Sequence, residues 1–259
     1  MNTARAESAT IAFRSSPVAS PALRDPTPES LCGRVLQHRY LPGALLGAGP
    51  FGSRYLAMDL ARDQTVCLEL LPRRALSRWG EIRAALTRLA ELDDPNIARL
   101  LDYGLIARGW PYLVLERGAA RTLSDELASS GPFELGRVVR VGAQCASALA
   151  AAHGAGVLHG ALTPDRIALG APGGRELARV AGFGLAPLVQ ANLDALLGGP
   201  PELCCYASPE HACGAPLDAS SDIYSLAAVL YALAAGRPVF EGSATGVLRQ
   251  QRRADPEPP

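Results

Sequence analysis

Lysine is absent from this chain. The 259 residues contain 25 basic side chains, and every one of them is arginine. Sites that need a lysine amine are therefore excluded, whether the amine acts as a nucleophile, a base or a compact cation. Arginine does not replace lysine in such sites, because its guanidinium group is planar, bulky and permanently protonated. On the surface, a codon bias toward arginine is a sufficient explanation.

The chain also lacks net charge, long apolar runs and paired cysteines. Its 25 acidic residues balance the 25 basic ones, which disfavours binding to nucleic acid or to an anionic membrane. The strongest apolar run, residues 226–235, is too short to span a bilayer. The six cysteines are scattered and no secretory leader is visible, which is typical of a reducing compartment. We therefore expect a cytoplasmic protein without disulfides.

The first half of the chain has the pattern of a small β-rich lobe. Residues 1–33 mix Ser, Thr, Ala, Pro and Arg without a period, and we expect them to form a disordered extension. Short apolar segments separated by turns then predict strands at residues 40–46, 53–59, 65–71, 100–105 and 111–116. Helical spacing of apolar residues between positions 79 and 89 predicts one helix. Residues 34–118 are thus expected to form an N-terminal lobe.

The second half is mainly helical. Helices are predicted at residues 123–129, 136–153, 221–235 and 244–253, and Gly154 and Gly236 are expected to close two of them. Residues 119–253 should form a C-terminal lobe, and residues 254–259 a disordered tail. Strands followed by helices indicate an α+β protein in two lobes.

Short motifs follow one another along the whole chain. A glycine-rich hairpin, L-G-A-G-P-F-G, is followed in order by D-P-N-I, P-Y-L-V-L-E, G-V-L-H-G-A-L-T-P-D-R-I, A-G-F-G-L-A, Y-A-S-P-E and S-D-I-Y-S-L. From residue 33 to residue 259 this series resembles the eukaryotic-like Ser/Thr protein kinases of bacteria. The resemblance implies a bilobal α+β fold with a nucleotide cleft between the lobes. It also implies a C-terminal lobe truncated at its last helices.

The resemblance places six working positions of a kinase on residues that cannot do the same work. These positions are Glu69 for the phosphate-binding lysine, Ala85 for its glutamate partner, Ala161 for the catalytic aspartate, Thr163 for a nearby lysine, and Arg166 and Gly182 for the two magnesium ligands. The alignment of the second position is left open, because Glu81 lies one turn before it. The charge at the lysine position is reversed in either alignment. The resemblance therefore implies no catalytic residues and no metal site.

Remnants of a nucleotide pocket are expected at Gly47, Gly49, Gly52, Arg54, Cys67 and Glu116. Pro50 removes a backbone N–H from the hairpin whose amides cradle phosphate in kinases. Arg54 and Glu69 are predicted to face the cleft from adjacent strands and to pair there, with Arg166 as the other candidate partner. The alternative is that Arg54 reaches solvent and pairs with nothing.

Other motif positions imply structural roles. These are His159 beneath the catalytic loop, Asp222 receiving the backbone of that loop, Phe183 and Gly184 at a hinge, and Glu210. Glu210 is expected to lack the arginine that the later helices of relatives supply, so either local residues compensate or a patch stays exposed. Residues 182–210 contain no Ser or Thr before Ser208, so a phosphorylation switch is not expected there.

The same region contains two further patterns. Apolar residues from 187 to 197, followed by Gly198, predict a short amphipathic helix that packs over the cleft, with partner binding as the alternative. Cys204, Cys205, His211 and Cys213 lie close in sequence, but their spacing matches no usual zinc site, and we interpret them as small buried side chains.

Three functions remain for comparison. The first is a pseudokinase, a kinase-like domain without phosphotransfer that acts as a binding scaffold or regulator in signalling. Its partner would be another protein, either an active kinase or that kinase's substrate, and it would need no cofactor. The alternative is a residual Ser/Thr protein kinase with weak or unconventional use of Mg-ATP. The third is a truncated remnant without function.

Overall fold

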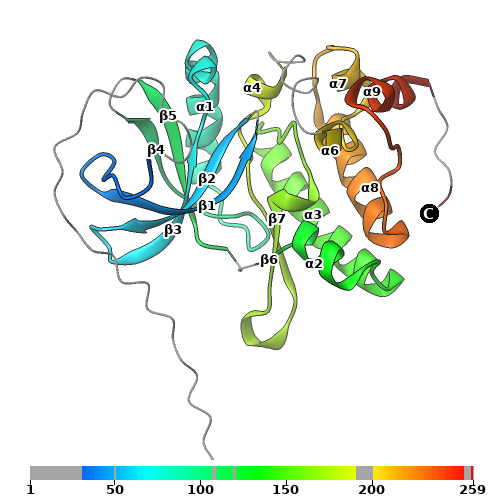
Figure 1. Cartoon of the computed structure of the whole chain (residues 1–259), viewed down its shortest axis with the longest axis horizontal. Coiled ribbons are helices and arrows are strands. Elements are labelled where there is room, and N and C mark those ends of the chain that lie inside the picture. Colours follow the sequence, from blue (N-terminus) through cyan, green and yellow to red (C-terminus); the bar gives the residue numbers. More distant parts are fainter. Residues whose placement is uncertain are drawn as a thin grey trace, which may run out of the picture.

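The computed structural model describes residues 31–49, 51–106, 109–118, 121–190, 201–253 and 258. Two lobes lie side by side, one formed by a twisted sheet with one long helix and the other mainly by helices (Figure 1). We call the described residues up to Gly118 the N-lobe and those from Arg121 the C-lobe. This arrangement confirms the predicted α+β fold in two lobes.

Five antiparallel strands form the N-lobe sheet in the order β1-β2-β3-β5-β4. They are β1 (Tyr40–Gly49), β2 (Gly52–Asp59), β3 (Gln64–Leu70), β4 (Leu100–Ile106) and β5 (Trp110–Glu116). Each bound lies within three residues of its predicted position. Alternation along β2 and β3 buries Tyr55, Val66 and Leu68 completely, which explains why these segments form strands.

A six-residue 3-10 segment, η2 (Arg73–Arg78), leads into helix α1 (Trp79–Ala90). Ile82, Leu86 and Leu89 lie on the buried face of α1 and join the large core cluster that continues into the C-lobe. The core is therefore shared between the lobes at this end of the cleft, and α1 cannot move without disturbing it.

The C-lobe contains four substantial helices and three short ones. They are α2 (Leu123–Ser130), α3 (Leu135–Gly154), α4 (Ala186–Gln190), α6 (Pro201–Cys204), α7 (Pro209–Ala212), α8 (Ala219–Ala235) and α9 (Ala244–Arg253). Helix α8 begins two residues earlier than predicted, because Asp218 and Ser221 form a capping box. It ends at Gly236, whose left-handed φ of 74° favours glycine.

A small three-stranded sheet joins the base of the cleft to the C-lobe. Its strands are β6 (Arg121–Thr122), β7 (Ile167–Gly170) and β8 (Leu177–Val180), with the 3-10 turns η3 (Pro164–Arg166) before β7 and η4 (Pro172–Gly174) between β7 and β8. The sequence did not predict this sheet, because strands of two to four residues carry no measurable alternation.

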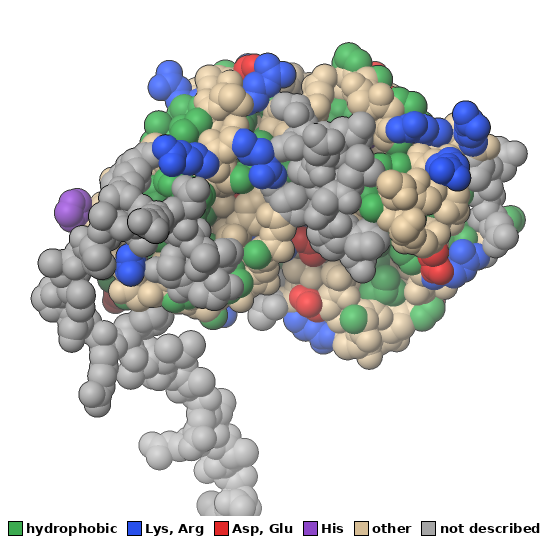
Figure 2. Space-filling view, turned by 45° about the horizontal axis from the view of Figure 1, so that its top comes forward, with side chains coloured by type: hydrophobic (Ala, Val, Ile, Leu, Met, Phe, Trp, Pro, Cys, Tyr) green, Lys and Arg blue, Asp and Glu red, His purple; other side chains and the backbone are tan. Residues whose placement is uncertain are grey.

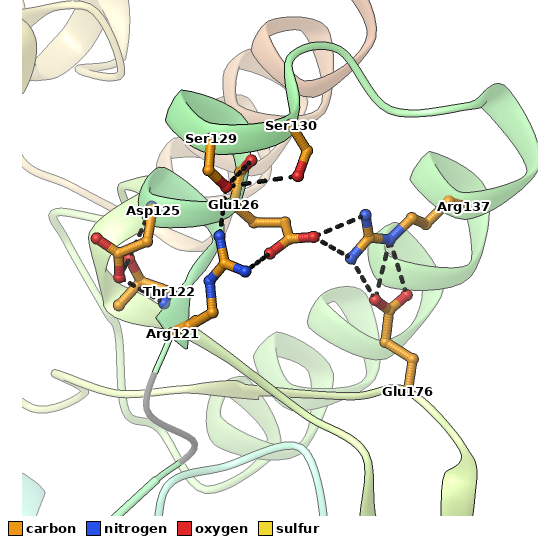
Figure 3. A network of polar contacts seen from close by, with 8 residues as sticks. All are labelled: Arg121, Thr122, Asp125, Glu126, Ser129, Ser130, Arg137 and Glu176. Atoms are coloured by element: carbon orange, nitrogen blue, oxygen red, sulfur yellow. Dashed lines mark hydrogen bonds and ion pairs between the residues drawn. The ribbon is translucent and has the colours of Figure 1, made fainter.

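Helix α2 is anchored to both neighbours by polar contacts, as Figure 3 shows. Thr122 and Asp125 form a capping box at its start. Glu126 forms ion pairs with Arg121 at 3.2 Å and with Arg137 of α3 at 3.4 Å. Arg137 also binds Glu176, just before β8, at 2.6 Å. These contacts hold α2 at the mouth of the cleft.

The chain ends differ from prediction in two details. Leu31, expected in the disordered extension 1–33, is only 1% exposed and packs in the N-lobe core, because its side chain completes the apolar cluster around Tyr40. Residues 1–30 lie outside the described residues. In the expected tail 254–259 the structure describes Pro258, whose carbonyl accepts a hydrogen bond of 3.4 Å from the hydroxyl of Tyr231.

A helix that spans a membrane must be both long and apolar. Within the described ranges, no helix has the length and apolarity needed to cross a bilayer. On the face drawn in Figure 2, arginine side chains lie over both lobes, which agrees with a chain of zero formal net charge.

Candidate functional site

The cleft between the lobes holds two cavities separated by charged side chains. A cavity of about 250 Å³ lies beside the end of β5 and is lined by Leu46, Cys67, Leu115 and Glu116. A second cavity of about 260 Å³ lies beneath the glycine-rich hairpin. Its lining includes Gly47, Gly49, Phe51, Gly52, Ala161, Thr163 and Tyr206. Arg54, Asp165 and Arg166 line both cavities and therefore form the wall between them.

The inner part of this wall is an ion pair between Glu69 and Arg166. One guanidinium nitrogen of Arg166 donates to both carboxylate oxygens of Glu69, at 2.7 and 2.9 Å. The Glu69 side chain is 0% exposed and that of Arg166 is 13% exposed, so the pair is nearly dry. Burial alone would lower the pKa of Arg166, but the charges of Glu69 and Asp165 raise it above its ordinary value.

The outer part of the wall is an ion pair between Arg54 and Asp165. Nη2 of Arg54 lies 2.6 Å from the Asp165 carboxylate, and its Nη1 donates to the backbone carbonyl of Asp165 at 2.9 Å. The Thr163 hydroxyl donates to the other oxygen of Asp165. Burial alone would raise the pKa of Asp165, but Arg166 and Arg54 lower it below its usual range.

These contacts correct the predicted pairing of Arg54 with Glu69. The two residues are opposite one another in the β2–β3 ladder, as the sequence implied. Glu69 nevertheless binds Arg166, the other candidate partner, and Arg54 turns to Asp165. The alternative of an unpaired, solvated Arg54 is wrong for the same reason. The C-lobe turn η3 presents a carboxylate and a guanidinium side by side, so it matches both strands at once.

Two glycines of the cleft have backbone conformations that other residues adopt at a cost. A Cβ on Gly52, whose φ is 143°, would lie 2.6 Å from the carbonyl oxygen of Leu70, so this position of the hairpin requires glycine. Gly182 has a φ of 95°, and a Cβ there would lie 3.3 Å from Nη1 of Arg166. The guanidinium of Arg166 therefore lies against the position that the resemblance gives to a metal-binding aspartate.

On α1 the structure separates the two candidates for the helix glutamate. Ala85 is buried, and its Cβ lies 3.5 Å from the Cβ that a side chain on Gly184 would have. Glu81 is exposed and binds Arg78 on the same surface at 2.9 Å. Neither residue contacts Glu69 among the described interactions, so this helix contributes no charge to the cleft.

The end of β5 is also joined to the C-lobe. Glu116 forms an ion pair of 2.8 Å with Arg179 of β8 and accepts a hydrogen bond from the backbone N–H of Arg99. Cys67 lies in the same cavity, and burial together with the charge of Glu69 raises the pKa of its thiol to about 11. That thiol is mostly protonated at neutral pH and is a weak nucleophile.

Beneath the cleft, Asp222 holds the loop that carries His159. Its carboxylate, 1% exposed, accepts the backbone N–H groups of His159 at 2.9 Å and Gly160 at 2.7 Å, and contacts Nε2 of His153 at 2.8 Å. Burial lowers the pKa of His159, whose ring packs edge-on against Phe183 with centroids 5.1 Å apart. These residues fix the loop that contains Ala161.

Glu210, for which the sequence predicted no arginine partner, has a local hydrogen-bond partner. Its carboxylate accepts a hydrogen bond from the hydroxyl of Ser221 at the start of α8. Cys204, Cys205 and His211 are buried as predicted, whereas the prediction is wrong for Cys213, which is exposed. No cluster of metal-ligating side chains is found among the described residues. Of the amphipathic helix expected at 187–197, the structure describes α4, and residues 191–200 lie outside the described residues, as does Pro50.

Two residues of the cleft were missed by sequence reasoning. Asp165 was read only as part of a motif, and Arg179 was not considered. The signal for Asp165 was its position directly before Arg166. Two consecutive residues of opposite charge can bind an arginine and a glutamate that lie on adjacent strands, here Arg54 and Glu69. Arg179 carried no comparable signal.

Comparisons with known proteins identify the family of this domain. Residues 40–255 match the protein kinase domain family. Serine/threonine-protein kinase pkn3 of Myxococcus xanthus is 33% identical over 253 residues, which cover 92% of this chain and 45% of the relative. PknB of Mycobacterium tuberculosis is 33% identical over 238 residues, covering 86% and 37%. The chain thus spans less than half the length of these curated relatives.

A solved structure supports the fold independently. The kinase domain of Mycobacterium tuberculosis PknI superposes with a TM-score of 0.62 at 20% identity, covering 85% of this chain and 96% of that domain. At this level of identity the likeness concerns the fold alone. Together with the match over residues 40–255, the sequence relatives show that the chain belongs to the bacterial serine/threonine protein kinase family.

Proposed function

We propose that this chain is a pseudokinase, a protein kinase domain that does not transfer phosphoryl groups and acts as a binding scaffold or regulator in signalling. The observation that carries the proposal is the buried Glu69–Arg166 pair at 2.7 Å. In the kinase mechanism a lysine at the position of Glu69 holds the nucleotide phosphates, and acidic or amide groups at the positions of Gly182 and Arg166 hold the magnesium ions.

Electrostatics supports this proposal. A unit charge about 4 Å from a phosphate contributes roughly 4 kcal/mol at an effective dielectric constant near 20. Replacing a lysine by Glu69 reverses this contribution, a change of about 8 kcal/mol. That change is comparable with the roughly 8 kcal/mol of a micromolar complex. Arg166 is bound to Glu69 and offsets part of this carboxylate charge, so about 8 kcal/mol is an upper bound, but the paired cleft still lacks the roughly 4 kcal/mol that a lysine would contribute.

The acidic groups of the cleft also support it. Asp165 directly precedes the metal-ligand position of Arg166, and its carboxylate is bound to Arg54 and Thr163. Ala161 and Gly182 have no acidic side chain. To use Asp165 or Glu69 as a ligand, a divalent cation would have to displace a guanidinium group, and it would meet the positive charges of Arg54 and Arg166.

The alternative is a residual Ser/Thr protein kinase with weak or unconventional use of ATP. One observation favours it, namely the cavity of about 250 Å³ between Leu46, Leu115 and Glu116, which remains large enough for a flat base. This cavity ends at the wall formed by Arg54, Asp165 and Arg166. A base could therefore enter without the phosphates reaching the positions that transfer requires.

The partner and the location remain part of the proposal. We infer that the partner is another protein, either an active kinase or that kinase's substrate. The equal numbers of acidic and basic residues support a protein partner over nucleic acid or a membrane, and the cysteine pattern supports a cytoplasmic location. Because the chain spans less than half of its curated relatives, the activity of the whole protein is likewise a proposal.

Thermal unfolding with ATP, with and without magnesium, tests the proposal. A ligand at 100 times its Kd adds about 2.7 kcal/mol of stability, which raises the Tm of a domain of this size by roughly 5–10 °C. We expect a shift below about 1 °C for the natural chain at millimolar Mg-ATP, and no transfer of label from radioactive ATP to a protein acceptor. A magnesium-dependent rise in Tm, or transfer above a heat-inactivated control, would overturn the proposal.

A matched variant provides the positive control. The changes Glu69→Lys, Ala161→Asp, Arg166→Asn and Gly182→Asp return four positions to the kinase pattern and remove the inner ion pair of the charged wall. We expect this fourfold variant to gain a magnesium-dependent rise in Tm. Its response shows that the assay detects binding to this fold.

A further inference from the structure

Ion pairs connect the two lobes across the open side of the cleft. Arg54 of β2 binds Asp165 of η3 at 2.6 Å, and Glu69 of β3 binds the next residue of η3, Arg166, at 2.7 Å. We propose that these two pairs, which we call the latch, hold the lobes closed in a single arrangement without any ligand. The latch would thereby replace the nucleotide as the group that contacts both lobes.

The pattern of charge allows only one closed register. Arg54 and Glu69 are opposite each other in the β2–β3 ladder, and Asp165 and Arg166 are consecutive in η3. Arg54 and Glu69 therefore each face a side chain of opposite charge. If η3 were displaced by one residue along the sheet, either Arg166 would face Arg54 or Asp165 would face Glu69, depending on the direction of the displacement. Like charges would then meet in a partly buried site, which is unfavourable.

The two pairs of the latch differ in burial, and both must break when the lobes separate. The inner pair is 0% and 13% exposed, whereas the outer pair is 21% and 41% exposed. The inner pair is thus the drier of the two, and opening of the cleft would expose both pairs to water. The net free energy of a buried ion pair is small, because desolvation offsets attraction. Its main effect is specificity, since each charge must find its partner for the lobes to close.

The back of the cleft is fixed separately, so the latch acts at its front. The backbone N–H of Ala98 donates to Val180 at 2.9 Å, and the N–H of Val180 donates to Asn96 at 2.7 Å. The pair of Glu116 and Arg179 adds a contact of 2.8 Å beside β5. Opening is thus expected as a rotation about this back edge, with the hairpin side moving away from η3.

This inference rests on the proposed function in one respect, because a cleft that bound Mg-ATP would not need a protein latch. Two native cysteines allow a direct test of closure. Cys32 in the N-lobe and Cys213 in the C-lobe are exposed, whereas Cys145, Cys204 and Cys205 are buried. Half-buried Cys67 is changed to alanine, and mass spectrometry verifies that two spin labels are attached.

The measurement is the distance distribution between the labels by double electron–electron resonance. We expect one narrow distribution for the labelled natural sequence, unchanged by Mg-ATP. Arg166→Gln, and separately the milder Arg54→Gln, should broaden it or add a longer distance. A fourfold variant with all charges reversed, Arg54→Asp, Glu69→Arg, Asp165→Arg and Arg166→Glu, should restore the narrow distribution. Circular dichroism verifies that each variant is folded.

A control variant separates the latch from a general loss of charge. Arg78→Gln removes an ion pair with Glu81 on the N-lobe surface, where the side chains are 42% and 56% exposed, and it should leave the distribution unchanged. A broad distribution in the natural sequence, or narrow distributions in both latch variants, would refute the latch and leave the proposed function intact. Narrowing of a broad distribution by Mg-ATP would overturn both.

Discussion

Removing Arg166 should destabilise the protein far more than removing the whole Glu69–Arg166 pair. The change Arg166→Met leaves the carboxylate of Glu69, which is 0% exposed, without its guanidinium partner. Loss of one member of a buried pair costs about 3–5 kcal/mol, because an uncompensated charge stays in a dry site. At roughly 2–4 °C per kcal/mol for a domain of this size, the Tm should fall by about 6–20 °C.

The double variant Glu69→Leu with Arg166→Met gives the opposite expectation. Apolar side chains of similar volume replace both charges, so no buried charge is left and no large cavity forms. Such replacements are neutral or stabilising by about 1–4 kcal/mol in comparable sites. We therefore expect the double variant to unfold at or above the Tm of the natural sequence.

The reverse single variant, Glu69→Leu, should cost less than Arg166→Met. Arg166 is 13% exposed and also interacts with the charge of Asp165, so its guanidinium keeps a partner and some contact with water. We expect a loss of about 1–2 kcal/mol, below the range for breaking a fully buried pair.

Urea unfolding followed by circular dichroism measures all three variants. The double-mutant cycle then isolates the coupling between the two residues, provided that the denaturant slope m stays constant. Two results would contradict this reasoning. One is a loss of less than about 1 kcal/mol in the free energy of unfolding for Arg166→Met, and the other is a double variant that is as unstable as Arg166→Met alone.

Two further predictions concern the C-lobe. Asp222→Ala leaves the backbone N–H groups of His159 and Gly160 unpaired in a buried site. Urea unfolding should show that the free energy of unfolding falls by about 3–5 kcal/mol, against less than about 0.5 kcal/mol for the exposed control Glu81→Ala. A loss as small as that of the control would contradict the role of Asp222. Burial lowers the pKa of His211 to about 4, so the ring is neutral in the folded state at neutral pH. The free energy of unfolding should therefore be highest above about pH 7 and should fall by on the order of 3 kcal/mol as the pH decreases from 6.5 to 4. An NMR titration of His211 near 6.5, or the same loss in His211→Gln, would contradict this.

The fold was predictable because its long elements carry strong local signals. Alternation along β2 and β3, helical spacing along α1 and the glycine after α8 placed these elements close to their observed bounds. The sheet of β6, β7 and β8 was not predictable, because its strands are too short to show a period. Leu31 was assigned to the disordered extension because its neighbours are polar or small, and only the assembled lobe reveals the pocket that buries it.

The site was predictable in its positions but not in its pairings. The motifs placed Glu69, Arg166 and Gly182 in one cleft, and the strand register placed Arg54 opposite Glu69. Which cation binds Glu69 depends on how η3 approaches the sheet, and this approach is set by packing between lobes that are distant in sequence. Arg54 was therefore assigned the nearer carboxylate, although Asp165, 111 residues further along the chain, is its partner.

The charges of the cleft wall balance one another without a ligand. Kinases leave part of this balance to their ligands, since lysine faces phosphates and carboxylates face magnesium. In this chain Arg54 and Arg166 balance Asp165 and Glu69, and every charge of the wall has a partner of opposite sign within 3 Å. Breaking the inner pair by removing one partner would leave the other charge unpaired in a nearly dry site, at a cost of about 3–5 kcal/mol. Changing only Glu69 to lysine, or only Arg166 to asparagine, would therefore leave one charge of the inner pair without its partner, whereas changing Ala161 or Gly182 alone leaves both pairs intact.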